Sequence, residues 1–373
     1  MPTTYRYLFA DLLTNTIIAE LPLTGVSFGS QLNQAGSFQG HILLSGINTT
    51  AFNITNSTIP AKCAVYVDRD GTLVWGGIIW NRSYQSSSQT LTINAREFES
   101  YFEKRRITSD QVFTNIDQLT IAQNLISLAQ GVPYGNIGVQ VGVETSGVLL
   151  SRTYYGYEKK TYYSALQDLS RAENGFDFNI DVAYNGSGAP TKTLNLGYPR
   201  IGTTYSSTNP SALLFEFPAG NVVEYEYPED GSLVANTLYA LGAGSNEGKL
   251  EATYQDTTYL SAGWALYEEQ ANYSDVTDAT YLAELAQGQV TAVSYPPTVI
   301  KIIVPAYISP TYGTYSIGDS ARLRITDERF PATGTGTAIQ AGLDAIYRIV
   351  GIEVQPGENG PERVTLTLTT TTN

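Results

Sequence analysis

Residues Val74–Trp80, VWGGIIW, form an apolar run that contains two glycines, and the alternating run Thr90–Ile93, TLTI, follows after a polar turn. This pattern predicts a β-hairpin whose first strand contains Gly where a bulge or sharp coil is needed. The same plan returns near the C-terminus, where IVGIEV at Ile349–Val354 is followed by TLTL at Thr365–Leu368. The two stretches are either two ordinary hairpins or the marks of two related β-modules.

The glycines provide the simplest alignment of the two stretches. When Gly77 is matched with Gly351, Leu91 and Leu366 follow 14 and 15 positions later. Turn chemistry predicts further hairpins nearby, because Asp-Gly and Gly-Asp pairs favour tight turns between strands. The candidate turn or bulge residues are Gly71, Gly76, Gly77, Gly318, Asp319 and Gly351.

The succession of patterns predicts a mainly β chain with α+β inserts. Short strands near both ends predict two small β-barrel domains. Helical spacing between them, for example over Tyr163–Glu173, Ala262–Gln270 and Thr277–Gln287, predicts two inserted α+β segments. The expected domains are 1–108 for the first barrel, which a segment near 221–243 could return to complete, 109–220 for an α+β insert, 221–294 for an acidic α+β segment and 295–373 for the second barrel.

Acidic charge is concentrated in one part of the chain. The 373 residues include 21 basic and 35 acidic side chains, a net charge of −14, and 13 of the acidic residues lie between Glu216 and Val290 beside the single base Lys249. Such a surface either keeps the chain soluble or repels polyanions, and tight binding to nucleic-acid phosphates is excluded in both cases. The clustered acidic candidates are Glu224, Glu226, Glu229 and Asp230.

Catalytic and metal-binding patterns are scarce. One His and one Cys exclude a site with two imidazoles, an internal disulfide and a thiolate cluster. His41 lies in an apolar strand-like stretch, where a structural role is far more common than catalysis. Asp68–Gly71 resembles the start of a calcium loop, but Val74 and Ile79 stand at later ligand positions, so a turn is the better interpretation. We therefore predict no catalytic residue, no cofactor and no metal.

Several motifs follow one another along the chain. They are FADLLTN at Phe9–Asn15, IAELPL at Ile18–Leu23, FQGH at Phe38–His41, the Val74–Trp80 strand and AREFESYF at Ala95–Phe102. NTLYALG at Asn236–Gly242 follows an α+β region, and a Gly-Asp turn precedes the strand Ala321–Ile325. Taken in order, these motifs resemble minor tail proteins of long-tailed bacteriophages that infect actinobacteria, and the last two are similar to tail hub proteins. The resemblance covers most of the chain, although residues 245–275 match poorly.

The resemblance implies a baseplate hub, also called the tail-associated protein, which is a homotrimer with two barrels per subunit. Three chains would form a six-barrel ring that joins the hexameric tail tube to the three-fold tip and forms part of the DNA channel. The implied partners are a distal tail or tube protein, the tape-measure protein and tip or fibre proteins. DNA would pass without specific binding, the acidic cluster would face the lumen or the outer surface, and contact with the host envelope would be indirect. The implied location is the tail tip of the virion, after synthesis in the bacterial host cytoplasm.

Two other functions stay open on the sequence. Exposed aromatic faces, with Trp75 and Trp264 as test positions, would suit a receptor- or glycan-binding tail protein. A pair of carboxylates in the acidic cluster would suit a glycosidase if they lay about 5 to 10 Å apart. No apolar run approaches the roughly 18 residues of a membrane helix, and no export signal is recognisable. Because the chain stops at Thr369–Asn373 after its last strand, we expect no appended hydrolase or fibre domain.

Overall fold

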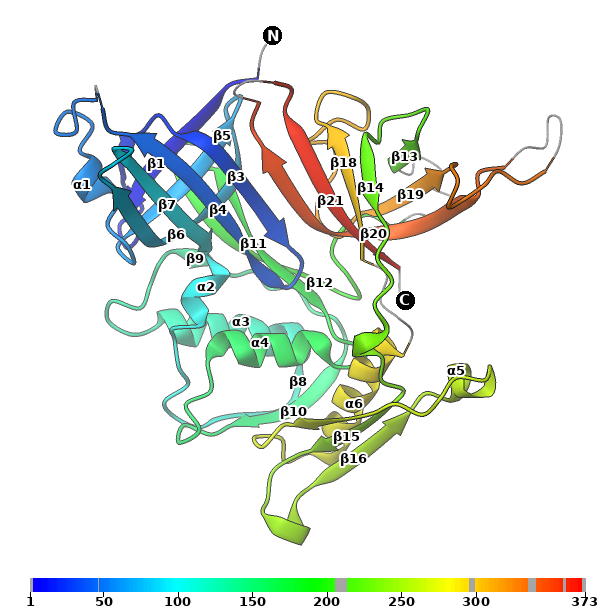
Figure 1. Cartoon of the computed structure of the whole chain (residues 1–373). Coiled ribbons are helices and arrows are strands. Elements are labelled where there is room, and N and C mark those ends of the chain that lie inside the picture. Colours follow the sequence, from blue (N-terminus) through cyan, green and yellow to red (C-terminus); the bar gives the residue numbers. More distant parts are fainter. Residues whose placement is uncertain are drawn as a thin grey trace.

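The computed structural model describes residues 3–45, 47–204, 213–294, 299–334, 340–357 and 360–370. Figure 1 shows two β-rich modules side by side, with an α+β region beneath them. We name the parts the N-terminal module (3–97), the first insert (98–204), the C-terminal module (213–230 and 299–370) and the second insert (231–294). The mainly β architecture with α+β inserts agrees with the prediction from the sequence.

The N-terminal module is an antiparallel sheet in the order β3-β4-β7-β6-β5-β1-β2. Its last strand, β7 (Thr90–Glu97), buries every second residue, which is the period-2 pattern of a strand with one face on a core. The β5–β6 turn places Asp70 and Gly71 at φ of +52° and +86°, as two-residue hairpins require. The other elements are β1 Tyr5–Asp11, β2 Ile17–Glu20, β3 Thr24–Gln31, β4 Gln34–Leu43, α1 Ile54–Ser57, β5 Cys63–Arg69 and β6 Thr72–Gln85.

The C-terminal module is a sheet in the order β14-β18-β21-β20-β19-β13, and it is discontinuous in sequence. Because β14 pairs with β18, and Val222 is buried in the core of this module, the expected return of 221–243 to the first barrel is wrong. The expected boundary at residue 295 lies outside the described residues. The strands are β13 Leu213–Phe217, β14 Glu224–Glu226, β18 Val299–Pro305, β19 Ser320–Ile325, β20 Leu343–Gln355 and β21 Arg363–Thr370.

The two modules share one topology. In chain order, β1, β3, β4, β5, β6 and β7 take the sheet positions that β13, β14, β18, β19, β20 and β21 take in the other module. The ladders agree in register, since Ser37–Leu43 pairs with β7 over seven residues and Val299–Pro305 pairs with β21 over the equivalent seven. One strand differs, because β13 runs parallel to β19 whereas β1 runs antiparallel to β5. The repeated hairpin plan is therefore a structural repeat.

Both repeated hairpins contain a β-bulge, at Trp80 in β6 and at Val350 in β20. Each bulge lies five residues before the last paired residue of its strand, Gln85 in β6 and Gln355 in β20. A residue of β6 is therefore equivalent to the residue of β20 that stands 270 positions later (355 − 85).

Each sheet curls round an apolar core, and side chains bring its two ends together. In the N-terminal module, the rings of Tyr5 on β1 and Phe28 on β3 lie 6.1 Å apart. In the C-terminal module, the rings of Phe217 on β13 and Tyr225 on β14 lie 5.2 Å apart. These contacts close each curled sheet into a small barrel.

The first insert follows β7 and contains two helices of more than two turns. Helix α3 (Gln118–Gln130) begins at Asp117, whose carboxylate accepts hydrogen bonds from the Leu119 and Thr120 amides. Helix α4 (Tyr162–Arg171) begins at Thr161, which caps it through the Ser164 amide. The other elements are α2 Glu99–Phe102, β8 Gln111–Asp117, β9 Val139–Gln140, β10 Leu149–Tyr154, β11 Asp177–Tyr184 and β12 Pro190–Gly197.

The second insert stands between β14 and β18, where the N-terminal module has only the short β3–β4 turn. Helix α6 (Ala279–Val293) packs on a sheet of β15 (Thr237–Leu241), β16 (Glu251–Gln255) and β17 (Glu268–Asn272). The helix expected over 262–270 is wrong, because α5 spans Thr257–Ser261 and β17 pairs in parallel with β15. Single 3₁₀ turns lie at Gly231–Leu233 and Asn246–Gly248.

The two inserts are packed together around a buried arginine. The Arg152 guanidinium lies 4.8 Å from the ring centroids of both Tyr154 and Tyr281, and 2.9 Å from the Asp275 carboxylate. Arg152 and Tyr154 belong to the first insert and the other two to the second, so the cation joins them. In the described part of the chain, no helix has the length and apolar character needed to cross a membrane.

Candidate functional site at the module junctions

One continuous sheet joins the two modules. Phe28–Gln31 of β3 pairs antiparallel with Gly351–Val354 of β20, and the Leu32 amide donates to the Val350 carbonyl at 2.9 Å. The pairing begins immediately after the β20 bulge, where β20 has left β19. A bulge increases local twist and bends its strand, so it exposes this length of β20 to the neighbouring module.

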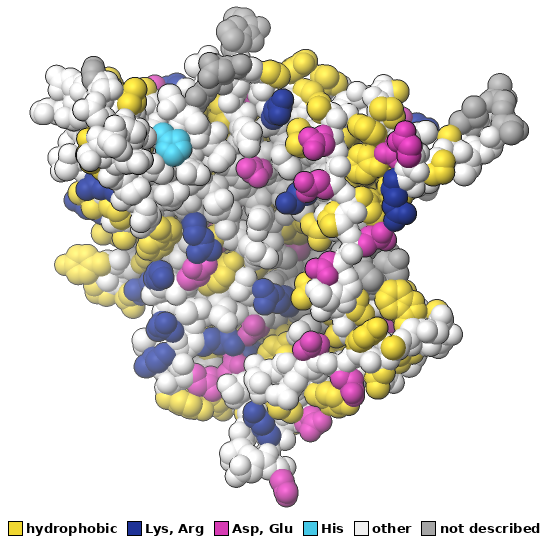
Figure 2. Space-filling model, viewed as in Figure 1, with side chains coloured by type: hydrophobic (Ala, Val, Ile, Leu, Met, Phe, Trp, Pro, Cys, Tyr) yellow, Lys and Arg dark blue, Asp and Glu magenta, His cyan; other side chains and the backbone are white. Residues whose placement is uncertain are grey.

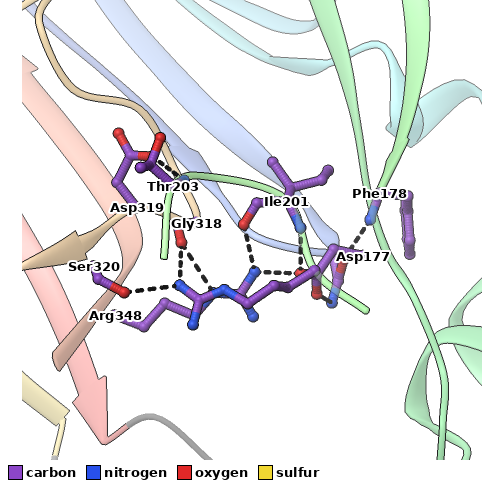
Figure 3. A network of polar contacts seen from close by, with 10 residues as sticks. Asp177, Phe178, Ile201, Thr203, Gly318, Asp319, Ser320 and Arg348 are labelled. Carbon is purple, nitrogen blue, oxygen red and sulfur yellow. Dashed lines mark hydrogen bonds and ion pairs between the residues drawn. The ribbon is translucent and has the colours of Figure 1, made fainter. Parts of the chain in front are cut away.

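A three-way polar junction lies beside this seam (Figure 3). The Asp177 carboxylate at the start of β11 accepts hydrogen bonds from Asn33 Nδ2 at 3.0 Å and from the Ile201 amide at 2.9 Å, and it forms an ion pair with Arg348 on β20. Asn33, at the tip of the β3–β4 hairpin, also accepts the Phe178 amide at 2.7 Å. Asp177 therefore holds the N-terminal module, the first insert and the C-terminal module together.

The junction continues through the turn before β19. Asp319 accepts the Thr203 amide at 2.6 Å, and the Gly318 carbonyl accepts from Arg200 at 2.5 Å. Gly318 has φ +93°, and a Cβ there would lie 2.3 Å from the Ile201 carbonyl oxygen. Only glycine allows this close approach of the first insert to the C-terminal module.

A second latch joins the modules at Glu362. The Glu362 carboxylate forms an ion pair of 2.8 Å with Arg69 at the end of β5 and accepts a hydrogen bond from the Tyr5 hydroxyl. The Arg69 guanidinium lies 5.1 Å from the ring centroid of Tyr312 in the C-terminal module. Burial, together with the Glu362 hydrogen bond, raises the pKa of Tyr5, so this phenol stays a donor.

Two buried carboxyl groups lie behind the β3–β4 hairpin. Glu97 accepts hydrogen bonds from the Gly36 amide at 2.6 Å and from the Ser30 hydroxyl. Glu99 accepts the Ile180 amide of β11 at 2.5 Å. Burial raises the pKa of Glu99 to about 7, and burial with the neighbouring Glu99 raises the pKa of Glu97 well above its usual range. This pair links the hairpin to the first insert.

The glycines singled out in the sequence take different places. Gly71 lies in the β5–β6 turn, and Gly76 lies where an added Cβ would be 2.9 Å from Val182 of the first insert. A Cβ at Gly77 would be 2.3 Å from the Arg96 carbonyl oxygen on β7. Gly351 follows the β20 bulge and is equivalent to Asn81, not to Gly77. Matching Gly77 with Gly351 therefore misplaces the repeat by four residues. The two glycines are needed for different reasons, since Gly77 lies against a backbone carbonyl and Gly351 follows a bulge.

The acidic candidates lie along one edge of the C-terminal module. Glu224 and Glu226 are exposed on β14. Glu229 forms an ion pair of 2.9 Å with Arg329, and Asp230 accepts the Ser232 amide at 2.8 Å. Figure 2 shows acidic side chains scattered over the centre, the right and the lower part of the view, with basic side chains among them.

The candidates for chemistry occupy structural positions. His41 Nδ1 lies 3.0 Å from Thr92 Oγ1, across the β4–β7 pair. Asp68 is buried, where it accepts the Gly71 amide and the Tyr184 hydroxyl. Trp75 is a core residue, so its proposed use as a glycan-binding face is wrong. Within the described residues, no three His, Cys, Asp or Glu side chains gather as metal ligands.

Sequence reasoning missed the residues that form the junctions. Asp177, Arg348 and Glu362 stand in stretches that read as ordinary strands or turns. Their side-chain partners lie between 144 and 357 positions away along the chain. Asn33 offered a signal, because Asn is the residue most often found with left-handed backbone after glycine, and its φ is +59°. That signal predicts a turn but not its partner.

No model of a protein family matches the sequence, and no curated protein matches it. Solved structures of similar fold include a tail protein from Neisseria meningitidis, with 13% identity and a TM-score of 0.63 over 99% of this chain and 97% of that chain. A 43 kDa tail protein of prophage MuSo2 from Shewanella oneidensis has 14% identity and a TM-score of 0.59 over 98% of both chains. The prophage tail protein gp18 from Listeria monocytogenes has 13% identity and a TM-score of 0.54, over 97% of this chain and 94% of that one. The chain therefore has the fold of these tail proteins, two of which are prophage proteins.

Proposed function

We propose that the chain is a structural virion protein, a homotrimeric hub at the tip of a bacteriophage tail. The observation that carries the proposal is the pair of topologically equivalent modules joined in one sheet through β3 and β20. A subunit with two equivalent modules supplies two equivalent positions to a ring. Three such subunits supply six, which is the number needed to meet a hexameric tube while keeping three-fold symmetry on the other side.

The proposed mechanism is mechanical. The ring adapts six-fold to three-fold symmetry and surrounds the DNA path, and the inserts, which break the six-fold equivalence, face the three-fold tip. In a closed three-fold ring every contact is heterologous, so two different edges of one subunit must be complementary. A net charge of −14 disfavours adhesion of DNA as it passes.

The proposed partners follow from this position. A distal tail or tube protein would contact the six-module face, the tape-measure protein would pass through the ring, and tip or fibre proteins would bind the three-fold face. Contact with the host envelope is indirect in this arrangement. The actinobacterial host and assembly in the host cytoplasm stay predictions.

Native mass spectrometry of the full chain, and cryo-electron microscopy of tail tips that contain it, test the proposal together. We expect three copies per ring, either in solution or on assembly. A stable dimer, or a tail in which the chain is absent from the tip, would contradict a hub.

A further inference from the structure

The equivalence of the modules identifies two sheet edges that the single chain leaves without a partner strand. β3 pairs with β4 on one side and with β20 on the other, whereas its equivalent β14 pairs, among the described residues, with β18 alone. The second edge is found in the same way. After its bulge, β20 pairs with β21 on one side and with β3 on the other. The equivalent part of β6, Asn81–Gln85, pairs with β7 alone in the described chain. One edge lies on each module.

The ladders establish which residues of the β14 edge match the β3 edge. Ser27 pairs with Gln39 on β4, and Glu226 pairs with Lys301 at the equivalent position of β18. Ser27 is therefore equivalent to Glu226. The next four residues of β3, Phe28–Gln31, which pair with β20, are equivalent to the four residues after Glu226, Tyr227–Asp230. Asp230 has extended backbone, with φ −110° and ψ 106°, and the four residues are half-buried or exposed.

The second edge is the part of β6 that follows Trp80, and the two bulges establish which of its residues match the β20 residues that pair with β3. Gly351–Val354, which receive β3, are equivalent to Asn81–Tyr84. Val354, which pairs with Phe28 of β3, is buried, whereas the equivalent Tyr84 is 54% exposed. A large aromatic side chain exposed at the place where its counterpart is covered indicates a surface that assembly covers.

From these two edges we propose that residues 227–230 of one subunit pair with residues 81–84 of the next, in the register that β3 and β20 use within the chain. The inference rests on the proposed trimer and names its interface. The register places Tyr227 opposite Tyr84, Pro228 opposite Ser83, Glu229 opposite Arg82 and Asp230 opposite Asn81. The occupant of each edge is therefore a second copy of this chain.

Charge complementarity supports this register. The acidic residues of the β14 edge, from Glu224 to Asp230, meet an edge that carries Arg82, and opposite charges directly across an antiparallel pair are favourable. Glu229 now pairs with Arg329 at side-chain exposures of 45% and 64%, and such an exposed ion pair contributes little, so Glu229 leaves it at little cost. Arg82 donates from Nη1 to the Thr55 carbonyl and the Thr58 hydroxyl, both at 2.8 Å, and its guanidinium has three further N–H donors for a carboxylate. Pro228 lacks an amide donor, so at this position only its carbonyl can form a hydrogen bond across the proposed interface.

Cysteine crosslinking tests the register in the full chain. Ser83 and Pro228 are both exposed, and both are replaced by cysteine in one variant. Because directly opposed Cβ atoms lie about 4.5–5.5 Å apart, oxidation is expected to give covalent dimers and trimers on a denaturing gel. The matched control pairs Ser83→Cys with Thr253→Cys on β16, and each single variant controls for the native Cys63, which is buried.

Charge exchange gives an independent readout. Arg82→Glu and Glu229→Arg are each expected to raise the concentration at which the trimer dissociates by about tenfold, since three interfaces change together, and the double exchange is expected to restore it. Glu251→Arg, exposed on β16, is the control, and circular dichroism of each variant checks that the monomer folds. A trimer that neither crosslinks nor responds to charge exchange would overturn the interface but leave the hub. A chain that forms no trimer alone or in tails would overturn both.

Discussion

The outer faces of the two equivalent sheets differ in chemistry. In the N-terminal module, Ala64, Tyr66 and Ile78 lie in the apolar core that β5 and β6 share with the first insert. The ladders match these positions with Ser320, Arg322 and Arg348 of the C-terminal module. At these positions one module packs on the first insert through apolar side chains, whereas the other carries residues that form hydrogen bonds and ion pairs. The same fold is therefore attached to the first insert by apolar packing in one copy and by polar contacts in the other.

The largest loss of stability is expected when a charged residue of the C-terminal outer face is placed at the equivalent apolar position of the N-terminal module. Ile78→Arg places a cation where the side chain is fully buried among apolar residues, and we expect a loss of more than about 4 kcal/mol in the free energy of unfolding, or no soluble protein. Ile346→Arg, at a half-buried position of the C-terminal outer face, should be tolerated. Chemical denaturation measures both. Near-normal stability of the Ile78 variant would contradict the shared core.

The reverse change tests the polar attachment. Arg348→Met removes the ion pair with Asp177 and leaves that carboxylate buried, so we expect a loss of about 3 kcal/mol. Arg322→Met removes an ion pair at exposures of 41% and 28% and should cost less than about 1 kcal/mol. Equal losses in the two variants, measured by urea denaturation, would remove the special role of the Asp177 junction.

The third test separates the two glycines that the sequence pattern equates. Gly77→Ala forces a Cβ to within 2.3 Å of a backbone oxygen, whereas the nearest atom to a Cβ at Gly351 is Thr367 Cβ at 3.1 Å. We expect Gly77→Ala to cost about 2 kcal/mol and Gly351→Ala less than about 1 kcal/mol. Thermal denaturation of the two variants measures both losses. A larger loss for Gly351→Ala than for Gly77→Ala would contradict the register of the repeat.

The fourth test uses pH, through the buried carboxyl groups Glu97 and Glu99. Glu97 is equivalent to Thr370, and it lies beside Glu99, Asp181 and Arg96. Because burial raises the folded-state pKa of Glu99 to about 7, its contribution to stability is fully present below about pH 4.5 and is lost as the pH rises to 7.

Glu99→Gln should therefore flatten the stability profile between pH 4.5 and 7, by about 2.5 kcal/mol. Urea denaturation at a series of pH values measures the profile, and Glu224→Gln, exposed on β14, is the control. An unchanged slope in the Glu99 variant would show that this carboxyl group titrates as if it were exposed.

The sequence predicts local features of the fold better than its long-range contacts. The strands, the Asp70-Gly71 turn and helix α6 follow from periodicity and turn chemistry, which act over a few residues. The prediction that residues 221–243 complete the first barrel was wrong, because β14 is a strand of only three residues and its pairing with the distant β18 leaves no local signal. The sequence shows that the Val74–Trp80 pattern recurs near the C-terminus, but it does not show which residues are equivalent. That equivalence depends on the positions of the two bulges, which are determined by strand pairing and not by glycine alone.

The junction residues show the same limit. Asp177, Arg348 and Glu362 carry no local signal, because a carboxylate in a strand reads as a solvent-facing residue until its partner is known. The acidic cluster was visible, but its place on a free sheet edge follows only from the topology of both modules.

Cryo-electron microscopy of the assembled ring, reconstructed without imposed symmetry, tests the central claim that the two modules are equivalent parts of one annulus. We expect three chains in which a rotation of about 60° places each N-terminal module on a neighbouring C-terminal module at the same radius. Modules found at different radii, or a contact between subunits made only through the inserts, would contradict the account.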